Sequence, residues 1–132
     1  MRTLLLDTNI VSYLFKQAPQ AKLYKPHLRD SRLAISFITV GELYRWAIVR
    51  DWGTKRRLDL EERLRNYVVI PFDVELCKRW AEVTSMHGPA ISESDAWIAA
   101  TALRHNIPLV SHNKKHFENI PHLTLIAEEE RP

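Results

Sequence analysis

Four side chains along the chain, three acids and one amide, have the chemistry to hold a divalent metal ion. Asp7, Glu42 and Asp95 offer carboxylate oxygens, and Asn113 offers an amide oxygen. Such hard oxygen ligands suit Mg²⁺ or Mn²⁺, ions that can activate a water molecule and stabilise the charge developing on a phosphodiester. The four residues are far apart in sequence, so this chemistry requires a fold that brings them together.

The first two acids stand close to the ends of predicted strands. Thr3 to Leu6 is a short apolar run, typical of a buried parallel strand, and Asp7 follows it directly. Leu33 to Ser36 predicts a second strand. Thr39 then opens a helical pattern, which places Glu42 in the first turn of that helix. Both acids are therefore expected near strand-to-helix junctions.

The other two candidates follow a similar pattern. Asp95 stands in the first turn of a helix, Ala96 to Leu103, that is apolar nearly all round and should be buried between other elements. Asn106 to Ser111 predicts a strand, and Asn113 lies just beyond its end. Two more strands are predicted at Val68 to Phe72 and Leu123 to Ile126. The remaining helices are predicted at Ile10 to Phe15, Gln20 to Asp30 with an interruption at Pro26, Lys55 to Tyr67, Asp73 to about His87 with Asp73 as the cap, and Lys114 to Glu118.

Strands and helices alternate along the whole chain, without repeats or an interdomain linker. This order predicts a single domain over residues 1–132 of the α/β class, a three-layer α/β/α sandwich with a mostly parallel sheet. In parallel sheets the carboxyl ends of the strands share one edge, where ligands bind. Asp7, Glu42 and Asn113 would all point to that edge, and the helix carrying Asp95 can begin there too.

Each acid also has a purely structural explanation. Asp7 can cap the helix that follows it, a common role for Asp. Thr39 and Glu42 have the spacing of a capping box, in which the Glu side chain reaches back to the backbone of the cap residue. Asp95 complements the dipole of its helix from the first turn. The residues alone leave both explanations open for each acid.

The charge balance is compatible with a polyanionic partner. The net charge is +3, and the body of the chain carries +6, because the acidic run Glu128 to Glu130 accounts for three negative charges. A basic surface can attract nucleic acid, although charge taken alone favours a merely solvated surface. The basic residues concerned are Lys22, Lys25, Arg29, Arg32, Arg45, Arg50, Lys55, Arg56, Arg57, Lys114 and Lys115.

Other classes of protein are disfavoured. Three glycines and no glycine-rich loop argue against nucleotide-binding fingerprints. His112 and His116 have an i, i+4 spacing but lack the further ligands of a zinc site. Ser111 beside His112 is not a hydrolase triad, because no nucleophile elbow surrounds the serine. Cys77 is the only cysteine and no signal segment or long apolar span is present, so we expect a cytoplasmic protein without a membrane anchor.

The ordered set of motifs resembles the PIN-domain family, in particular the VapC-type toxins of prokaryotic toxin–antitoxin pairs. The matching stretches are Leu-Asp7-Thr-Asn-Ile, Ile-Ser36 with Thr39-Val-Gly-Glu42-Leu, Ser92-Glu-Ser-Asp95-Ala-Trp-Ile-Ala-Ala, and Leu-Val-Ser111-His-Asn113 followed by Lys-Lys-His-Phe117. Each motif is weak alone, but four in the family's order, spread over the whole chain, make a specific signal.

The resemblance implies a metal-dependent endoribonuclease that cleaves RNA phosphodiesters with metal-activated water. Asp7, Glu42 and Asp95 would hold Mg²⁺ or Mn²⁺, with Asn113 completing the catalytic set. Thr8 and Ser111 would be supporting polar groups. Many members carry an aspartate where this chain has Asn113, which leaves the number of metal ions open.

The resemblance also implies partners, namely an RNA substrate, a cognate antitoxin protein and a second copy in a homodimer. One alternative is a catalytically idle domain of the same fold that serves as a binding or regulatory protein. Another is a phospho-acceptor receiver domain, which also places an acid after its first strand. Receivers usually pair two acids there and carry an acceptor Asp after the third strand, whereas this chain offers only Asp7 in the first place and Asp73 in the second.

Overall fold

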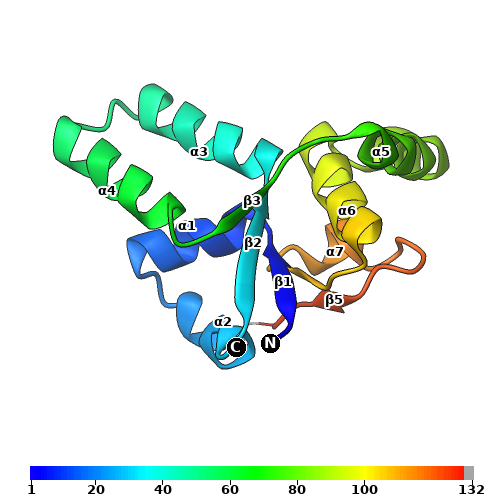
Figure 1. The fold of residues 1–132 in the computed structure, drawn as a ribbon, viewed down its shortest axis with the longest axis horizontal. Coiled ribbons are helices and arrows are strands. Elements are labelled where there is room, and N and C mark those ends of the chain that lie inside the picture. The colour runs from blue at the N-terminus through cyan, green and yellow to red at the C-terminus, as the bar shows by residue number, and fades with distance from the viewer. Residues whose placement is uncertain (130–132) are drawn as a thin grey trace.

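The protein is built around a five-stranded parallel sheet, seen here in a computed structural model that describes residues 1–129. The last acid of the predicted acidic run, Glu130, lies outside the described residues. The strand order is β3-β2-β1-β4-β5, and every neighbouring pair is parallel (Figure 1). The strands are β1 (Thr3–Leu6), β2 (Arg32–Ser36), β3 (Val68–Ile70), β4 (Leu109–Val110) and β5 (Leu125–Ile126).

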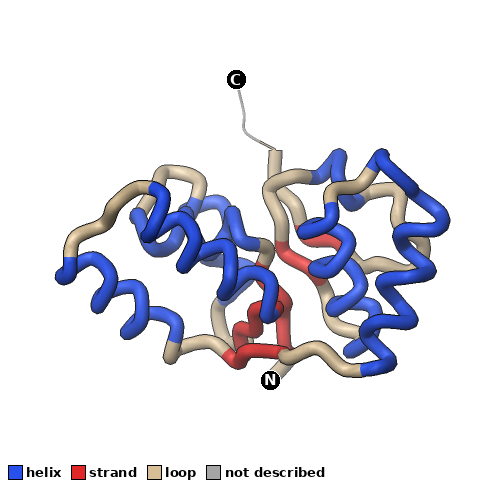
Figure 2. Tube along the Cα trace, turned by 90° about the horizontal axis from the view of Figure 1, so that it is seen from above, coloured by secondary structure: helices blue, strands red, loops and turns tan. Residues whose placement is uncertain are grey.

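Helices cover both faces of this sheet and make the three layers predicted from the sequence. One group of helices lies on one side of the strands and a second group lies on the opposite side (Figures 1 and 2). The first group is α1 (Thr8–Lys16), α2 (Ala21–Leu28), α3 (Phe37–Val49) and α4 (Thr54–Leu64). The second is α5 (Val74–His87), the short 3₁₀ turn η1 (Gly88–Ala90), α6 (Glu93–His105) and α7 (Lys114–Phe117).

Two hydrophobic clusters fill the space between the layers. Successive side chains of a strand point to opposite faces of its sheet. Leu4 and Leu6 of β1 accordingly pack with α1 to α4, whereas Leu5 packs with Ile98 of α6 and Phe117 of α7. All five side chains are buried, so both faces of the central strand are dry. Burial on both faces explains why Thr3 to Leu6 reads as a continuous apolar run.

Helix α6 is buried, as its apolar composition predicts. Six of its residues, Ala96, Ile98, Ala99, Ala100, Thr101 and Ala102, are inaccessible or nearly so. The helix lies between the sheet and α5, and Trp97 stacks on Trp80 of α5 with ring centroids 4.9 Å apart. This packing fixes the position of Asp95 in the first turn of α6.

Two predicted details of the helices are wrong. Helix α3 begins at Phe37, not at Thr39, because Ser36 at the end of β2 caps it by accepting a hydrogen bond from the Ile38 N–H at 3.3 Å. Glu42 therefore lies in the second turn, and Thr39 is not a cap. Pro26 lies within α2 without dividing it, because only two residues of the helix follow the proline.

The strand order separates this fold from that of a receiver domain. Receivers belong to the doubly wound class with the order 2-1-3-4-5. Here β2 lies between β3 and β1, and β4 lies on the other side of β1. Asp73, the only acid that could serve as a receiver's acceptor, caps α5 and pairs with Arg104 at 3.0 Å. None of the helices among residues 1–129 is long and apolar enough to cross a membrane.

Candidate active site

Asp7 is a buried carboxylate at the point where the strand order of the sheet reverses. It follows β1, which has β2 on one side and β4 on the other, and ligands bind at such a switch point in open α/β sheets. Its Oδ1 accepts a hydrogen bond from the Thr8 N–H at 2.7 Å, and its Oδ2 accepts one from the Ser111 hydroxyl at 2.7 Å. Asp7 does cap α1, as the structural explanation predicts, but the cap uses only one of its two oxygens.

The environment of Asp7 makes its negative charge costly. Burial is the main cause and, together with the charges of Asp95 and Glu42, it raises the pKa of Asp7 from 3.8 to about 6, against the opposing effect of the hydrogen bonds from Ser111 and Thr8. No Lys, Arg or His among the described residues pairs with Asp7. Asp7 is therefore an acid that a bound cation would stabilise.

Glu42 reaches the site through the hydroxyl of Thr8. The Thr8 hydroxyl donates to Glu42 Oε1 at 2.8 Å and lies 2.9 Å from the Thr39 hydroxyl. Because a hydroxyl has one proton to donate, Thr8 accepts in the second contact and Thr39 is the donor. Thr39 and Glu42, one turn apart on α3, thus face the start of α1. The spacing that suggested a capping box is instead the spacing of two side chains on one helical face.

Asp95 is engaged by a histidine that sequence reasoning did not assign to the site. The carboxylate is 15% exposed, and its Oδ2 lies 2.9 Å from Nδ1 of His116 on α7. Ser92 caps α6 by accepting a hydrogen bond from the Asp95 N–H at 3.2 Å, so the Asp95 side chain is not needed as a cap. The spacing of His116 and His112 suggested zinc, but His116 contacts Asp95 and His112 contacts Tyr24.

Asn113 lies at the rim of the site. Its backbone N–H donates to the Ser111 hydroxyl at 3.0 Å, and that hydroxyl in turn donates to Asp7. The side chain is exposed and forms no cap hydrogen bond to α7. Asn113 also lines an open groove of about 740 Å³ together with Lys114, Lys115, His112 and His116, and with three acids, Glu118, Glu128 and Glu129. Asn113 thus lies between the buried acid and a groove that carries both basic and acidic side chains.

These side chains suit a hard divalent cation in charge and in donor type. All the candidate donors are oxygens, and the charges of Asp95 and Glu42 are both felt at Asp7. However, within residues 1–129 no three His, Cys, Asp or Glu side chains converge closely enough to form a complete ligand set. Glu42 is held by Thr8 and Asp95 by His116, so these two carboxylates have to turn toward Asp7 before they can share an ion.

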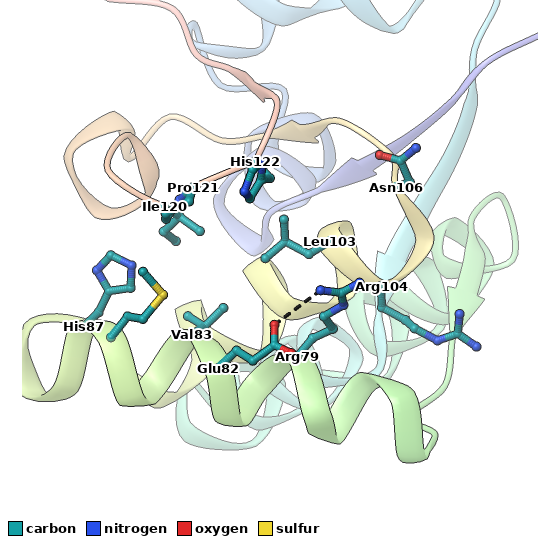
Figure 3. Close-up of a pocket in the computed structure, with 11 residues that line it drawn as sticks. Arg79, Glu82, Val83, His87, Leu103, Arg104, Asn106, Ile120, Pro121 and His122 are labelled. Carbon is teal, nitrogen blue, oxygen red and sulfur yellow. Dashed lines mark hydrogen bonds and ion pairs between the residues drawn. The ribbon is translucent and has the colours of Figure 1, made fainter.

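A second hollow lies elsewhere and has different chemistry. It has a volume of about 400 Å³ and lies between α5, the last turn of α6 and the segment from Ile120 to His122 (Figure 3). Its acid, Glu82, is paired with Arg79 at 3.3 Å (Figure 3). None of the predicted site residues lines it. Leu103, which does, is about 12 Å along α6 from Asp95, so this hollow is separate from the acidic site.

Known proteins share both the sequence pattern and the fold. The PIN domain family matches residues 4–123. Ribonuclease VapC1 from Haemophilus influenzae (strain R2866) is 33% identical over 124 residues, which cover 90% of this chain and 92% of that protein.

Solved structures resemble most of the chain, and two examples follow. A chain of VapBC2 from Rickettsia felis, bound to a DNA fragment from its promoter, has a TM-score of 0.84 and 25% identity, covering 96% of this chain and 99% of that chain. A chain of a toxin–antitoxin complex from Klebsiella pneumoniae has a TM-score of 0.73 and 27% identity, covering 93% and 95%. With its acids at the carboxyl edge of a parallel sheet and a family match over most of its length, the chain belongs to the PIN-domain family.

Proposed function

We propose that this protein is a metal-dependent endoribonuclease and the toxin of a type II toxin–antitoxin pair. The observation that carries the proposal is the state of Asp7, a buried acid without a basic partner among the described residues, whose pKa is raised to about 6 by burial and by two further acids. Such a group needs a cation, and the ribonuclease relatives belong to a family that is generally metal-dependent. Asp7, Glu42 and Asp95 are the proposed metal ligands, and Asn113 is the fourth member of the catalytic set.

The residues of the chain have distinct tasks in this proposal. A bound Mg²⁺ or Mn²⁺ supplies activation of water and charge neutralisation at the scissile phosphate. Ser111 and the Thr8 N–H hold the Asp7 carboxylate in one orientation, and Thr8 holds Glu42. His116 orients Asp95. Asn113 contributes an oxygen without a negative charge, so we propose one tightly held ion at this site.

RNA would approach along the groove beside Asn113. Lys115 lines this groove and is exposed, so it can contact phosphates, whereas Lys114 would first have to leave its ion pair with Glu129 at 3.4 Å. Phosphate contacts of this kind provide attraction that is independent of sequence. An RNA substrate and an antitoxin partner would place the protein in the cytoplasm. The antitoxin would silence the toxin by inserting its tail among the acids Asp7, Glu42 and Asp95.

A homodimer is part of the proposal, and an exposed apolar strip supports it. Strand β3 is an edge of the sheet, and Val68 and Val69 on it are each 47% exposed. The strip continues through Phe72, 66% exposed, to Val74, 71% exposed. Exposed apolar side chains at an unpaired sheet edge are typical of association surfaces. Sedimentation velocity should show a dimer for the parent and a monomer for Val69→Lys with Phe72→Ser, whereas a monomeric parent would refute this part of the proposal.

The decisive experiment measures cleavage of a fluorescent RNA by the purified parent, by Asp7→Asn and by Asp95→Asn. The parent should cleave with Mn²⁺ or Mg²⁺ and stop when EDTA is added, and both variants should be inactive at unchanged helix content. Asn caps helices about as well as Asp, so lost activity would reflect metal chemistry rather than folding. A parent that binds RNA but never cleaves it would instead support the idle, regulatory alternative.

A further inference from the structure

Three cations gather where α1, α3 and α4 meet, at the ends of these helices that lie away from the acids. Lys16 is the last residue of α1, Arg50 follows the end of α3, and Arg56 is in the first turn of α4. These residues are called the three-cation cluster below. All three are exposed. They come from separate segments, so only the fold brings them together.

Aromatic rings hold the cluster in place. The Arg50 guanidinium lies 4.9 Å from the centroid of the Trp46 ring, and the Lys16 ammonium lies 6.0 Å from the same centroid. Arg56 lies 4.3 Å from the Trp52 ring centroid, and Trp52 is buried. Cation–π contacts at these distances restrict the side chains without neutralising their charge. The cluster is therefore ordered before any ligand arrives.

No acid neutralises these charges. Among the described residues none of the three forms an ion pair. Partial loss of water around the Lys16 ammonium, and the positive charges of Arg50 and Arg56, hold the pKa of Lys16 below its usual value. Neighbouring Arg57 differs, because it donates to the backbone carbonyls of Trp52 at 2.7 Å and Ala47 at 3.3 Å. Arg57 fastens the turn between α3 and α4, whereas the cluster remains available to an anion.

An open groove lies against the cluster. It has a volume of about 600 Å³ and is lined by Lys16, Lys55 and Arg56, with Asp59 as its only acid. Positive lining of this kind suits a phosphate group, and Arg in particular can bind phosphate oxygens through two donors at once.

Helix α1 connects the groove to the acidic site. Asp7 caps its start and Lys16 is its last residue, which gives a separation of about 14 Å along the helix. Helix α3 also has Glu42 near its start and Arg50 at its end, and both helices lie on the same side of the strands (Figures 1 and 2). One polyanion can therefore contact the acids at one end of α1 and the cluster at the other.

We propose that the three-cation cluster binds backbone phosphates of the RNA substrate a few nucleotides from the cleaved bond. This inference rests on the proposed ribonuclease function and adds a second, remote contact to it. The cluster would anchor the strand without reading its sequence, because phosphates are the same in every nucleotide. An acidic protein segment is the competing ligand that the experiment below separates from RNA.

The test measures affinity for a 20-nucleotide single-stranded RNA as a function of salt, with Asp7→Asn present throughout to prevent cleavage. Log affinity falls as log salt rises, and each phosphate contact to a single strand contributes about 0.7 to the steepness of this fall. Arg50→Gln with Arg56→Gln should therefore make the slope less steep by about 1.4. At 0.1 M salt this corresponds to about a 25-fold loss of affinity. Arg50→Lys with Arg56→Lys should keep the salt slope, since the charges remain.

The matched control is Lys22→Gln on α2 with Arg29→Gln just after that helix, which removes the same net charge from two exposed residues outside the cluster. It should leave the salt slope unchanged and weaken binding less than about threefold, because distant exposed charges are screened. Equal effects of the two double variants would overturn the inference, as would a cluster variant that binds RNA normally but loses antitoxin. If the background protein binds no RNA at all, the proposed function itself fails. Thermal melting of each variant checks that it is folded.

Discussion

The side chains of Asp7 and Ser111, 104 residues apart in sequence, are joined by a 2.7 Å hydrogen bond that spans two neighbouring strands. Parallel pairing of β1 with β4 aligns Leu6 with Val110, so the next residue of each strand leaves the sheet at the same level. Ser111 also accepts a hydrogen bond from the Asn113 N–H. The order of the strands is thus what brings the first and last motifs of the chain into contact.

Ser111→Ala should therefore raise the pKa of Asp7 further above 6. The hydrogen bond from Ser111 is the largest influence that favours the charged form of Asp7, and its loss leaves one carboxylate oxygen buried without a donor. We expect weaker Mn²⁺ binding at pH 6, where protons compete, and a smaller deficit at pH 8. Carbon NMR titration of the Asp7 carboxyl and metal titration at both pH values measure these effects. Ser85→Ala on the exposed surface of α5 is the control and should change neither.

Asp7→Asn should stabilise the metal-free protein, and its advantage should grow with pH. The pKa of Asp7 is about 6 in the folded protein and 3.8 when unfolded. The folded state therefore holds the proton more tightly, and the free energy of unfolding of the parent falls as pH rises from about 4 through 6. The contribution of Asp7 to the free energy of unfolding changes by about 3 kcal/mol over this pH range, since one pKa unit corresponds to 1.36 kcal/mol. Urea unfolding in EDTA at pH 4, 5, 6 and 7 measures it.

A second acid provides a control with the opposite sign. Hydrogen bonds from Arg104 and the Leu76 backbone lower the pKa of Asp73, so this carboxylate contributes stability above its unfolded pKa and loses it as pH falls. Asp73→Asn should therefore destabilise the protein more at pH 7 than at pH 4. A constant difference between parent and Asp7→Asn across this pH range would contradict the shifted pKa of Asp7.

The sequence predicts the sheet well because burial on both faces has a clear signature. Thr3–Leu6 is matched at both ends, and β4 and β5 lie within their predicted ranges. The start of α3 was missed because Thr39 and Glu42 imitate a capping box, whereas Ser36 is the actual cap. Local spacing could not reveal that Thr39 donates to Thr8, 31 residues away. That contact depends on how α1 and α3 pack together.

The sequence singles out the three acids but not the histidine that contacts one of them. Asp7, Glu42 and Asp95 were marked by their positions after strands or near helix starts, and their family roles remain a proposal. His116 was seen only as half of an incomplete zinc pattern. Its contact with Asp95 joins α7 to α6, which no periodicity in the chain encodes. The basic residues were visible as a list, but only the fold separates the three-cation cluster from the other exposed cations.

Thr8→Val should disturb the site, although the Val side chain has nearly the shape of Thr and leaves helix α1 intact. The substitution removes the hydroxyl that donates to Glu42 and accepts from Thr39, so both lose a partner. Thr8 and Thr39 are buried, and a stranded hydroxyl costs about 1–3 kcal/mol. We expect lower stability by this amount and reduced cleavage. Thr8→Ser keeps the hydroxyl and should retain most activity, so equal losses in the two variants would show that packing by the methyl group matters instead.

The last prediction separates a metal site from three acids with only structural roles, without using RNA. The charges of Asp95 and Glu42 both oppose ionisation of Asp7, so the metal-free fold carries a repulsion that a cation would relieve. Mn²⁺ should therefore raise the melting temperature of the parent. Binding to the folded state alone gives about 2.7 kcal/mol at a hundredfold excess over the dissociation constant.

Asp95→Asn makes this prediction sharper. In EDTA the variant should melt at or above the temperature of the parent, because it loses one of the repelling charges and Asn can still contact His116. With Mn²⁺ added its advantage should disappear, because the variant has lost a ligand and binds the ion less tightly. If the acids have only structural roles, Mn²⁺ will change the melting temperature of neither protein. A melting series for both proteins, in EDTA and in increasing Mn²⁺, therefore decides the matter, and a parent insensitive to metal would remove the basis for the site.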